Sequence, residues 1–296
     1  MHDVIIIGGG PAGMSAALVL ARCFRNILIC DTGKPRNRWA REMHGFLSRD
    51  GIPPLEFLEL AKKDLSKYNV PWKNAEVVSA ECNGNLFTIK LQDNSVLQSK
   101  KLLVATGMKD SLPALPGIEE FYGTSVHHCP YCDGFECGEK AVIAYGEGSE
   151  AKGLAISLKT WCKNVTLCTD GFPINKATRD LLTRNEVKIE TRKIEKLNGE
   201  SGRMESITLI DGTDISANSM FFVEKTRQQS DITRQLNCVF TQKGVVRTDR
   251  YHKTNIKGLY VAGDADKDMQ QVVVAAAEGA KAGISINKEL QKEEMK

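Results

Sequence analysis

The stretch that decides the fold is VIIIGGGPAG, residues 4–13, close to the start of the chain. Residues 4–7 form a continuous β-branched run, which is typical of a strand buried on both faces of a parallel sheet. The glycine turn follows, and residues 14–23 then carry helix-forming side chains. A second apolar run at residues 27–30 completes a strand–helix–strand unit. We therefore predict an α/β fold in which helices cover the faces of a parallel sheet.

The spaced glycines of this turn have separate steric roles. The first permits the tight turn, the second lets backbone N–H groups approach a pyrophosphate, and the third lets the helix pack closely on the strand. Asp31 ends the next strand, where its carboxylate can accept a hydrogen bond from a ribose hydroxyl. A tight turn without a ligand is the alternative, but strand, helix and acid in register favour dinucleotide binding. The predicted cofactor-binding residues of the loop are Gly8, Gly10, Pro11, Ala12 and Gly13.

Length and composition narrow the class of protein. At 296 residues the chain is longer than one core usually needs, so we expect two domains. Lys and Arg number 40 against 37 Asp and Glu, and their dispersion argues against a nucleic-acid-binding surface. No stretch reaches the roughly 20 apolar residues of a membrane helix. Nine cysteines, an odd number without regular spacing, are untypical of a secreted disulfide framework. We therefore expect a cytoplasmic protein that binds neither nucleic acid nor membrane.

Shorter alternating segments follow the first strand–helix–strand unit. Residues 77–80, 86–91 and 95–97 alternate apolar and polar side chains, a pattern typical of antiparallel strands. We expect these strands to form a smaller sheet inserted into the first domain. Residues 101–105 then return to a buried apolar run. The segment LPALPG, residues 112–117, marks a stiff connection and a domain boundary.

A second strand–helix–strand pattern begins near residue 140 and is the only internal repeat in the sequence. Residues 141–144 predict a strand, and the turn GEGSEA follows at residues 146–151. A helix is predicted at residues 152–161 and a further strand at residues 165–168. The chain thus contains two modules of the dinucleotide-binding type.

The C-terminal part of the chain carries a second cofactor motif. Residues 259–262 predict a late strand that ends at a glycine and an acid, and residues 271–290 predict a long helix rich in alanine. The acid can meet the ribityl or phosphate part of an extended cofactor, and the helix opens toward its ring. This motif favours FAD over a nicotinamide. The predicted contacts are Gly263, Asp264, Gln271 and Val272.

Near the middle of the chain stands CPYCDG, residues 129–134. A Cys-x-x-Cys segment can close a small, strained and exposed disulfide, and a flavin could supply or remove the two electrons involved. Half of a zinc site is the alternative, since His127, His128 and Cys137 could supply further ligands. Together with a flavin loop, the cysteine pair favours redox chemistry, and we expect no metal.

These motifs resemble those of the low-molecular-weight thioredoxin reductase family of flavin disulfide oxidoreductases, over nearly the whole chain. The resemblance implies two Rossmann-like domains with parallel sheets plus small antiparallel sheets, and a homodimer. It implies an FAD-binding domain split between residues 1–114 and 246–296, and a central nucleotide-binding-like domain at residues 117–243 that carries the cysteine pair. The matching segments are residues 8–13, Ala105-Thr106-Gly107, residues 129–134, Gly263-Asp264 and Gln271, so Thr106 and Gly107 join the predicted cofactor site.

The resemblance also implies roles for three side chains. Cys132 is expected to be the flavin-facing sulfur, and Cys129 the interchange sulfur that reacts with the substrate. Asp133 is expected to shuttle the proton, because a thiolate leaving group needs an acid and a thiol nucleophile needs a base. The implied substrate is a thioredoxin-like protein or a small dithiol or disulfide.

The sequence departs from the common pattern in the central module. Typical thioredoxin reductases carry a His-Arg-Arg run there, whose arginines hold the 2′-phosphate of NADPH. This chain has LCTDG at residues 167–171 instead. Asp170 would repel a phosphate and at best bind the hydroxyl of NADH, and Glu147 adds a carboxylate to the central glycine loop. We therefore expect neither NADPH nor NADH to be used in the usual way.

This departure resembles a branch that includes nicotinamide-independent reductases and the dithiol oxidases of gliotoxin and holomycin biosynthesis. In those oxidases a substrate dithiol reduces the cysteine pair, the pair reduces FAD, and oxygen reoxidises the flavin. Three enzymes stay open: a thioredoxin reductase-like enzyme with an unusual electron partner, such a dithiol oxidase, and a NAD(P)H-dependent thioredoxin reductase. A non-catalytic flavin sensor is less favoured, because a binder needs no Asp133 beside the cysteines.

Overall fold

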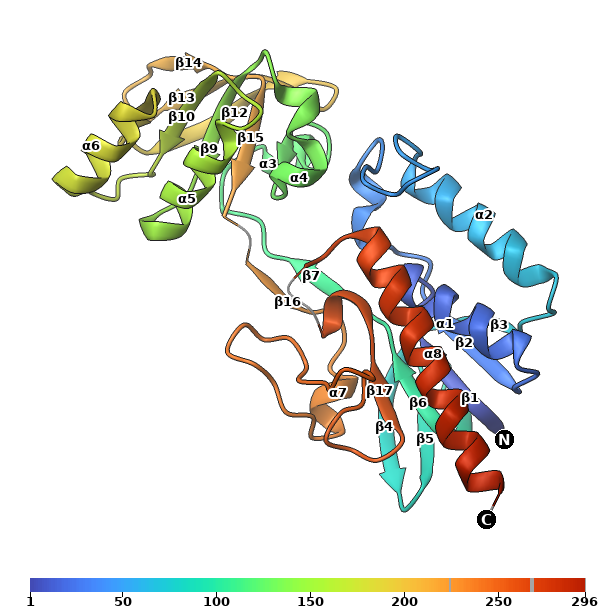
Figure 1. Cartoon of the computed structure of the whole chain (residues 1–296). Coiled ribbons are helices and arrows are strands. Elements are labelled where there is room, and N and C mark those ends of the chain that lie inside the picture. The colour runs from blue at the N-terminus through green and yellow to red at the C-terminus, as the bar shows by residue number, and fades with distance from the viewer. Residues whose placement is uncertain (224, 267–268, 296) are drawn as a thin grey trace. The chain divides into compact units, whose positions relative to one another are not determined.

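The computed structural model describes residues 1–223, 225–266 and 269–295. Contacts divide the chain into two compact units. The first unit comprises Met1–Arg38, Gly45–Lys109 and Thr226–Lys296, and the second comprises Trp39–His44 and Asp110–Lys225 (Figure 1). The first unit thus combines N-terminal and C-terminal segments of the chain, and it contains the predicted cofactor loop.

The first unit is built on a seven-stranded sheet in the order β3-β2-β1-β6-β5-β4, with β17 beside β6. Strand β1 pairs in parallel with β2 and β6, and β17 also runs parallel to β6. This is the parallel sheet predicted from the apolar runs. The strands are β1 (His2–Ile7), β2 (Ile27–Asp31), β3 (Trp72–Asn74), β4 (Val77–Asn83), β5 (Leu86–Leu91), β6 (Val96–Val104) and β17 (Leu259–Val261).

Three helices accompany this sheet: α1 (Pro11–Arg22), α2 (Pro54–Ser66) and α8 (Val272–Glu294). Small residues let α1 and α8 pack closely, as Figure 1 shows. A Cβ atom at Gly279 of α8 would lie only 1.9 Å from the carbonyl oxygen of Ala12 in α1. Helices α1 and α8 pack against the first strands of the sheet through one buried apolar cluster. The predicted α/β class is confirmed.

The expected separate antiparallel sheet is wrong, because β4 and β5 extend the main sheet. The strands predicted at residues 95–97 and 101–105 fall largely within one strand, β6 (Val96–Val104). Its start pairs antiparallel with β5 and its end pairs parallel with β1. Ser99 and Lys101 interrupt the apolar pattern although both are buried. The Lys101 ammonium is paired with Glu289 and Glu293 of α8, which explains how a charged side chain is tolerated there.

The second unit has a five-stranded parallel sheet in the order β11-β10-β9-β15-β8. Helix α5 (Gly148–Leu158) connects β9 to β10, and α6 (Lys176–Arg184) connects β10 to β11. Helix α5 begins four residues before the predicted start, since Glu147 already has the extended backbone of an N-cap. The strands are β8 (Val126–His127), β9 (Ala141–Tyr145), β10 (Asn164–Cys168), β11 (Val187–Glu190) and β15 (Ser219–Phe222).

The remaining elements are short. Strands β12 (Ile194–Glu200), β13 (Arg203–Leu209) and β14 (Asp214–Ser216) form a small antiparallel sheet, and β7 (Met108–Asp110) pairs with β16 (Thr226–Gln228). No helix in the described part of the chain is both long and apolar enough to cross a membrane. The short helices are η1 (Arg36–Trp39), α3 (Ile118–Phe121), α4 (Pro130–Asp133), η2 (Phe135–Cys137), α7 (Ile232–Gln235) and η3 (Gly263–Ala265).

The boundaries of the two units differ from the expected domain boundaries. The chain returns to the first unit at Thr226 rather than at residue 246. Hydrogen bonds explain this, because the Gln228 amide donates to the carbonyl oxygens of Gly244 and Ala265. Gln235 of α7 also bonds the backbone of β4. These contacts join segments that carry no periodic apolar pattern.

Candidate redox site and cofactor loop

The glycine loop has the close packing that the sequence predicts. Gly8 has a positive φ of 105°, and a Cβ atom there would lie 2.3 Å from the Ala105 carbonyl oxygen. A Cβ atom at Gly13 would meet the Gly8 carbonyl oxygen at 1.9 Å, whereas Gly10 has no heavy atom within 4 Å of its Cβ position. The loop is therefore tight where it meets the sheet and open at Gly10, where a pyrophosphate is expected to approach.

Asp31 at the end of β2 braces this loop. Its Oδ1 accepts a hydrogen bond from the Gly9 backbone N–H at 2.8 Å, and its Oδ2 accepts one from the Gly33 N–H at 2.8 Å. Each carboxylate oxygen keeps a second lone pair, so the predicted ribose contact stays possible. The sequence did not indicate the bracing role, because it depends on backbone groups rather than side chains.

The C-terminal motif of the first unit lies where the chain turns from β17 into η3. Asp264 Oδ2 accepts a hydrogen bond from Arg36 at 3.2 Å, and Arg36 also bonds the Gln270 side chain. Gln271 is the N-cap of α8, which starts at Val272. Arg36 was not among the predicted cofactor contacts, because the sequence does not indicate that its guanidinium turns toward Asp264.

Thr106 and Gly107 follow β6 at the carboxyl end of the sheet. The Thr106 hydroxyl is buried without a hydrogen-bond partner among the described residues, and Gly107 has a positive φ of 71°. An orphaned buried hydroxyl indicates a place where a ligand completes the hydrogen bonding. This group, together with the open loop at Gly10, fits an extended dinucleotide such as FAD.

The cysteine pair lies in the second unit, at the short helix α4. Cys129 is the N-cap of α4, and its carbonyl oxygen accepts hydrogen bonds from the N–H groups of Cys132 at 3.1 Å and Asp133 at 3.2 Å. Both cysteines are half-buried. The aromatic side chains beside them are exposed: Tyr131 is 74% exposed and Phe135 is 83% exposed.

The thiol of Cys129 is activated. A hydrogen bond from Cys132 lowers the pKa of the Cys129 thiol, and nearby backbone N–H groups assist, while burial and the Asp133 carboxylate oppose this shift. Burial instead raises the pKa of the five buried cysteines. Those five are Cys30, Cys162 and Cys238, each with a pKa of about 11, Cys168, with a pKa of about 12, and Cys137.

Asp133, the expected proton shuttle, contacts a histidine. The Oδ1 atom of Asp133 lies 3.2 Å from Nδ1 of His127, whose side chain is only 8% exposed. The His127 ring packs against Phe221 of β15, with the ring centroids 5.2 Å apart. The sequence offered His127 as a polar loop residue or a zinc ligand, so this contact was missed.

The described residues contain one group of three side chains close enough to share a metal ion, and the cysteine pair is not in it. That group is His252, Asp266 and Glu278 in the first unit, all buried. His252 Nδ1 lies 3.1 Å from Asp266 Oδ2, which also accepts a hydrogen bond from Thr248. The zinc alternative for the cysteine pair therefore gains no support.

The acid that follows the second strand of the central module makes two hydrogen bonds within the second unit. Asp170 follows β10, and its Oδ2 accepts a hydrogen bond from the Tyr145 hydroxyl at 2.8 Å. Its Oδ1 accepts one from the Ile194 N–H at 3.0 Å. Burial and the neighbouring Asp170 carboxylate raise the pKa of Tyr145, so the hydroxyl stays a donor. Each Asp170 oxygen thus accepts one hydrogen bond and, like the oxygens of Asp31, keeps a second lone pair.

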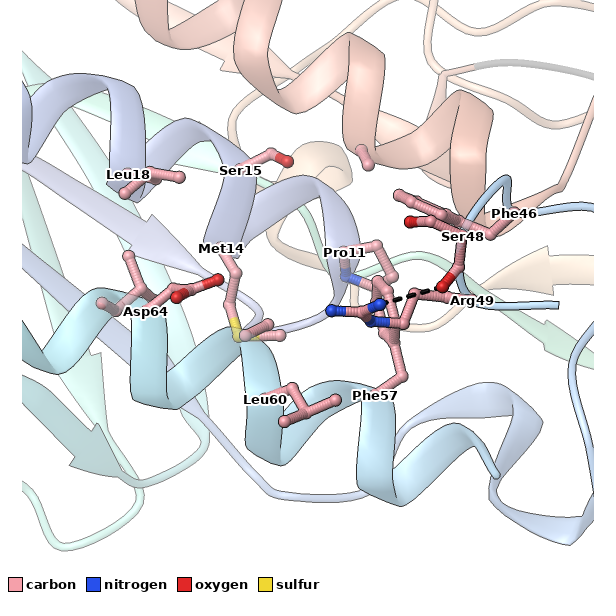
Figure 2. A pocket seen from close by; sticks show the side chains of 13 residues that line it. Pro11, Met14, Ser15, Leu18, Phe46, Ser48, Arg49, Phe57, Leu60 and Asp64 are labelled. Carbon is pink, nitrogen blue, oxygen red and sulfur yellow. Dashed lines mark hydrogen bonds between the residues drawn. The ribbon is translucent and has the colours of Figure 1, made fainter. Parts of the chain in front are cut away.

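A cavity of about 250 Å³ lies in the first unit between α1 and α2 (Figure 2). Figure 2 shows Met14 of α1 and Leu60 of α2 extending into the space between the two helices. Arg49 lies at its other side, where its guanidinium donates a hydrogen bond to the Ser48 carbonyl oxygen. Pro11 belongs both to this lining and to the cofactor loop.

The fold and the site define a flavin-dependent disulfide oxidoreductase. The chain belongs to the pyridine nucleotide-disulphide oxidoreductase family, which matches residues 2–279. This membership implies FAD, and it confirms the resemblance to low-molecular-weight thioredoxin reductases.

Relatives and solved structures agree with this assignment. The chain is 28% identical over 317 residues to thioredoxin reductase sirT of Leptosphaeria maculans, covering 97% of this chain and 94% of that one. TrxB of Bacillus anthracis, described as a thioredoxin reductase, is 31% identical with a TM-score of 0.95, covering 99% of this chain and 100% of that one. The HlmI structure is also 31% identical with a TM-score of 0.95, covering 99% and 94%.

Proposed function

We propose that the Cys129/Cys132 pair exchanges two electrons with FAD and with a thioredoxin-like protein or a small dithiol, without the usual use of NADPH or NADH. The observation that carries this proposal is the placement of Cys129 and Cys132, together with Asp133, at the single-turn helix α4, and the lowered pKa of the Cys129 thiol supports it. A thiolate is the nucleophile of thiol–disulfide exchange, so a thiol that ionises easily is suited to this reaction.

The exchange can be written with balanced atoms. The Cys129 thiolate attacks a substrate disulfide, a bond forms between Cys129 Sγ and one substrate sulfur, and the departing sulfur takes a proton held at Asp133. Cys132 then attacks Cys129 Sγ, which releases the second substrate thiol and leaves the Cys129–Cys132 disulfide. In reverse, a substrate dithiol reduces the pair. FAD, when bound, supplies or accepts the electron pair, and Cys132 is the sulfur that we propose to face it.

The first unit is proposed to hold FAD, and the second presents the cysteine pair to the substrate. Tyr131 and Phe135, both largely exposed, flank the cysteines. Exposed aromatic side chains beside a reactive group support a protein partner such as a thioredoxin. We further propose a cytoplasmic homodimer. The residues proposed to hold FAD are Gly8, Gly10, Pro11, Ala12, Gly13, Asp31, Thr106, Gly107, Gly263, Asp264, Gln271 and Val272.

The position of Asp170 supports the proposal that nicotinamides are not used in the usual way. Asp170 follows β10, where the arginines of typical thioredoxin reductases hold the 2′-phosphate of NADPH. Its negative charge disfavours a 2′-phosphate at the same place. The same observation favours a second candidate, a dithiol oxidase of the gliotoxin or holomycin type in which oxygen takes the electrons.

Anaerobic stopped-flow spectroscopy of the flavin tests the proposal. We expect rapid reduction by reduced thioredoxin or dithiothreitol, and slow or no reduction by NADPH and NADH. Rapid reduction by NADPH would show instead a NAD(P)H-dependent thioredoxin reductase. When oxygen is admitted, stoichiometric oxygen consumption with a small dithiol identifies the oxidase. Undiminished reduction by dithiols in both C129S and C132S would overturn the role of the pair.

A further inference from the structure

We propose that His127 is a positioning residue for Asp133, and that its imidazole holds the carboxyl group in place for the proton transfers at the cysteine pair. The inference rests on the proposed thiol–disulfide chemistry and names a residue that this chemistry needs. Nothing in the sequence motif itself marks His127, because it stands two residues before Cys129 and outside the CPYCDG segment.

Asp133 needs such a support because of where it lies. It is the last residue of α4, a helix of one turn, and its side chain is 26% exposed. A partly exposed carboxylate at the end of a short helix has several accessible rotamers, and fixing one of them costs conformational entropy. The contact of Asp133 Oδ1 with His127 Nδ1 at 3.2 Å selects one rotamer.

The imidazole itself is held by regular structure. His127 ends β8, which pairs in parallel with β15 so that His127 stands opposite Phe221. The two rings pack with their centroids 5.2 Å apart at an interplanar angle of 35°. Phe221 is fully buried in the core of the second unit. A donor carried by a buried strand can therefore orient an acceptor carried by a short surface helix.

The contact with His127 also determines which carboxyl oxygen of Asp133 can exchange a proton with a sulfur. Because the imidazole contact is made to Oδ1, Oδ2 is the oxygen assigned to the proton transfer with a sulfur. The Asp133 carboxylate also acts electrostatically on the Cys129 thiol, because its charge contributes to raising the pKa of that thiol.

Other titratable groups surround this contact. On the loop of residues 39–44, His44 Nε2 lies 3.5 Å from Glu136 Oε1 of η2 and 3.7 Å from Glu42 Oε2. Cys129 and Cys132 belong to α4 and its N-cap, Cys137 ends η2, and His128 follows β8. A pH profile of the wild-type protein therefore contains several ionisations. Only a comparison with Asp133 variants can assign one of them to the His127 contact.

Three variants test the inference through a double-mutant cycle. H127L removes the donor but keeps an apolar side chain beside Phe221, H127N keeps an N–H donor near the Nδ1 position, and D133N removes the acid. Dithiothreitol is the reductant, and the rate of flavin reduction is measured against pH. We expect H127L to lower the rate roughly 10- to 100-fold, as misplacement of a reacting group does. H127N should retain most of the rate.

The decisive comparison is H127L in the D133N background. A positioning residue has nothing left to position there, so the double variant should match D133N within about twofold, and the pH profile of H127L should resemble that of D133N. Fully additive effects of the two substitutions would overturn the inference. Should H127L fail to fold, judged by flavin content and thermal midpoint, H127Q carries the same comparison.

The failure of this inference can be separated from the failure of the proposed function. A wild-type flavin that dithiothreitol does not reduce contradicts the proposed function itself. A wild-type flavin that is reduced, with equal rates in H127L and wild type, contradicts only the role of His127.

Discussion

At the scale of single residues, the pKa of the Cys129 thiol differs in direction of shift from the pKa of the buried cysteine thiols. This difference sets the thiol chemistry of the protein. Cys129 lies at the start of a short helix, with a sulfur and backbone N–H groups as neighbours, and its pKa is lowered. Cys168, fully buried in the sheet of the second unit, has a pKa raised by burial to about 12. The same functional group is thus reactive at one place and inert at the other.

The first prediction concerns alkylation of these thiols. Thiolates react and thiols do not, so the rate at Cys129 should rise with pH through a midpoint below the ordinary value of 9.0. C132A removes the side-chain hydrogen bond that is the first cause of the lowering, and its midpoint should move to higher pH. Iodoacetamide labelling of the flavin-free protein, followed by peptide mass spectrometry, measures both midpoints. An unchanged midpoint in C132A would refute the assigned cause, and Cys168 serves as the unreactive control.

A second prediction concerns Glu289, which bonds Lys101, Lys253 and Tyr260. Burial alone would raise its pKa, but these hydrogen bonds lower the pKa to about 2. A carboxyl group whose folded-state pKa lies below its unfolded value of 4.5 stabilises the protein above that pH. This stabilisation is lost as the pH falls through the folded value.

We therefore expect the free energy of unfolding to fall between about pH 5 and pH 2, and E289Q to lose part of this dependence. At neutral pH E289Q should cost roughly 1–3 kcal/mol, because it weakens the satisfaction of a buried ammonium. Urea denaturation at several pH values measures both effects. Asp211 also has a pKa of about 2, but its side chain is 47% exposed, so D211N is the control, and an equal effect of both substitutions would contradict the argument.

At the scale of elements, the packing of α4 on its neighbour decides whether the cysteine pair is presented correctly. Gly134 caps α4, and a Cβ atom there would lie 2.9 Å from the Trp161 ring and 2.4 Å from the Pro130 carbonyl oxygen. The helix can approach Trp161 this closely only because Gly134 has no side chain. Tyr131 covers the same indole edge-on, with ring centroids 5.2 Å apart.

The third prediction follows from this packing. G134A should destabilise the second unit by about 1–3 kcal/mol, as overpacking typically does, and should slow thiol chemistry at the pair. G153A is the matched control, because Gly153 of α5 has open space at its Cβ position. It should stabilise the helix by about 0.5–1 kcal/mol. Thermal unfolding of both variants tests this, and equal melting temperatures would refute the steric argument.

Elements with an unbroken apolar pattern were predictable from the sequence. Strands β1, β2, β9 and β10 and the glycine turns after β1 and β9 lie where the pattern placed them. Strand β6 was divided in the prediction because Ser99 and Lys101 look like surface residues, although both are buried. The residues that pair with Lys101 lie far away in the sequence, so the local sequence pattern does not indicate these contacts.

The candidate site could likewise be predicted only in part from the sequence. The cysteine pair and the glycine loop were visible because their chemistry requires fixed spacing within one short segment. The contacts of His127 with Asp133, of Arg36 with Asp264 and of Tyr145 with Asp170 depend on how side chains turn after folding. Residue types and spacing alone do not determine these contacts.

At the scale of the whole molecule, the chain divides its chemistry between two units. The first carries the loop and the orphaned Thr106 hydroxyl that fit FAD, and the second carries the cysteine pair. The glycine turn of the second unit also lies between a strand and a helix, but Asp170 follows the next strand, where its negative charge disfavours a 2′-phosphate. This repeat is therefore proposed to support the pair structurally rather than to deliver electrons from a nicotinamide.

The central claim is that the cysteine pair and the flavin act as two electron carriers in one protein. Anaerobic reductive titration with dithionite tests it most directly, because it counts the electrons that each molecule takes up. The wild-type protein should take up twice as many electrons per flavin as C129S or C132S, since a disulfide and a flavin each accept a pair. Equal uptake by the wild type and both variants would contradict the account.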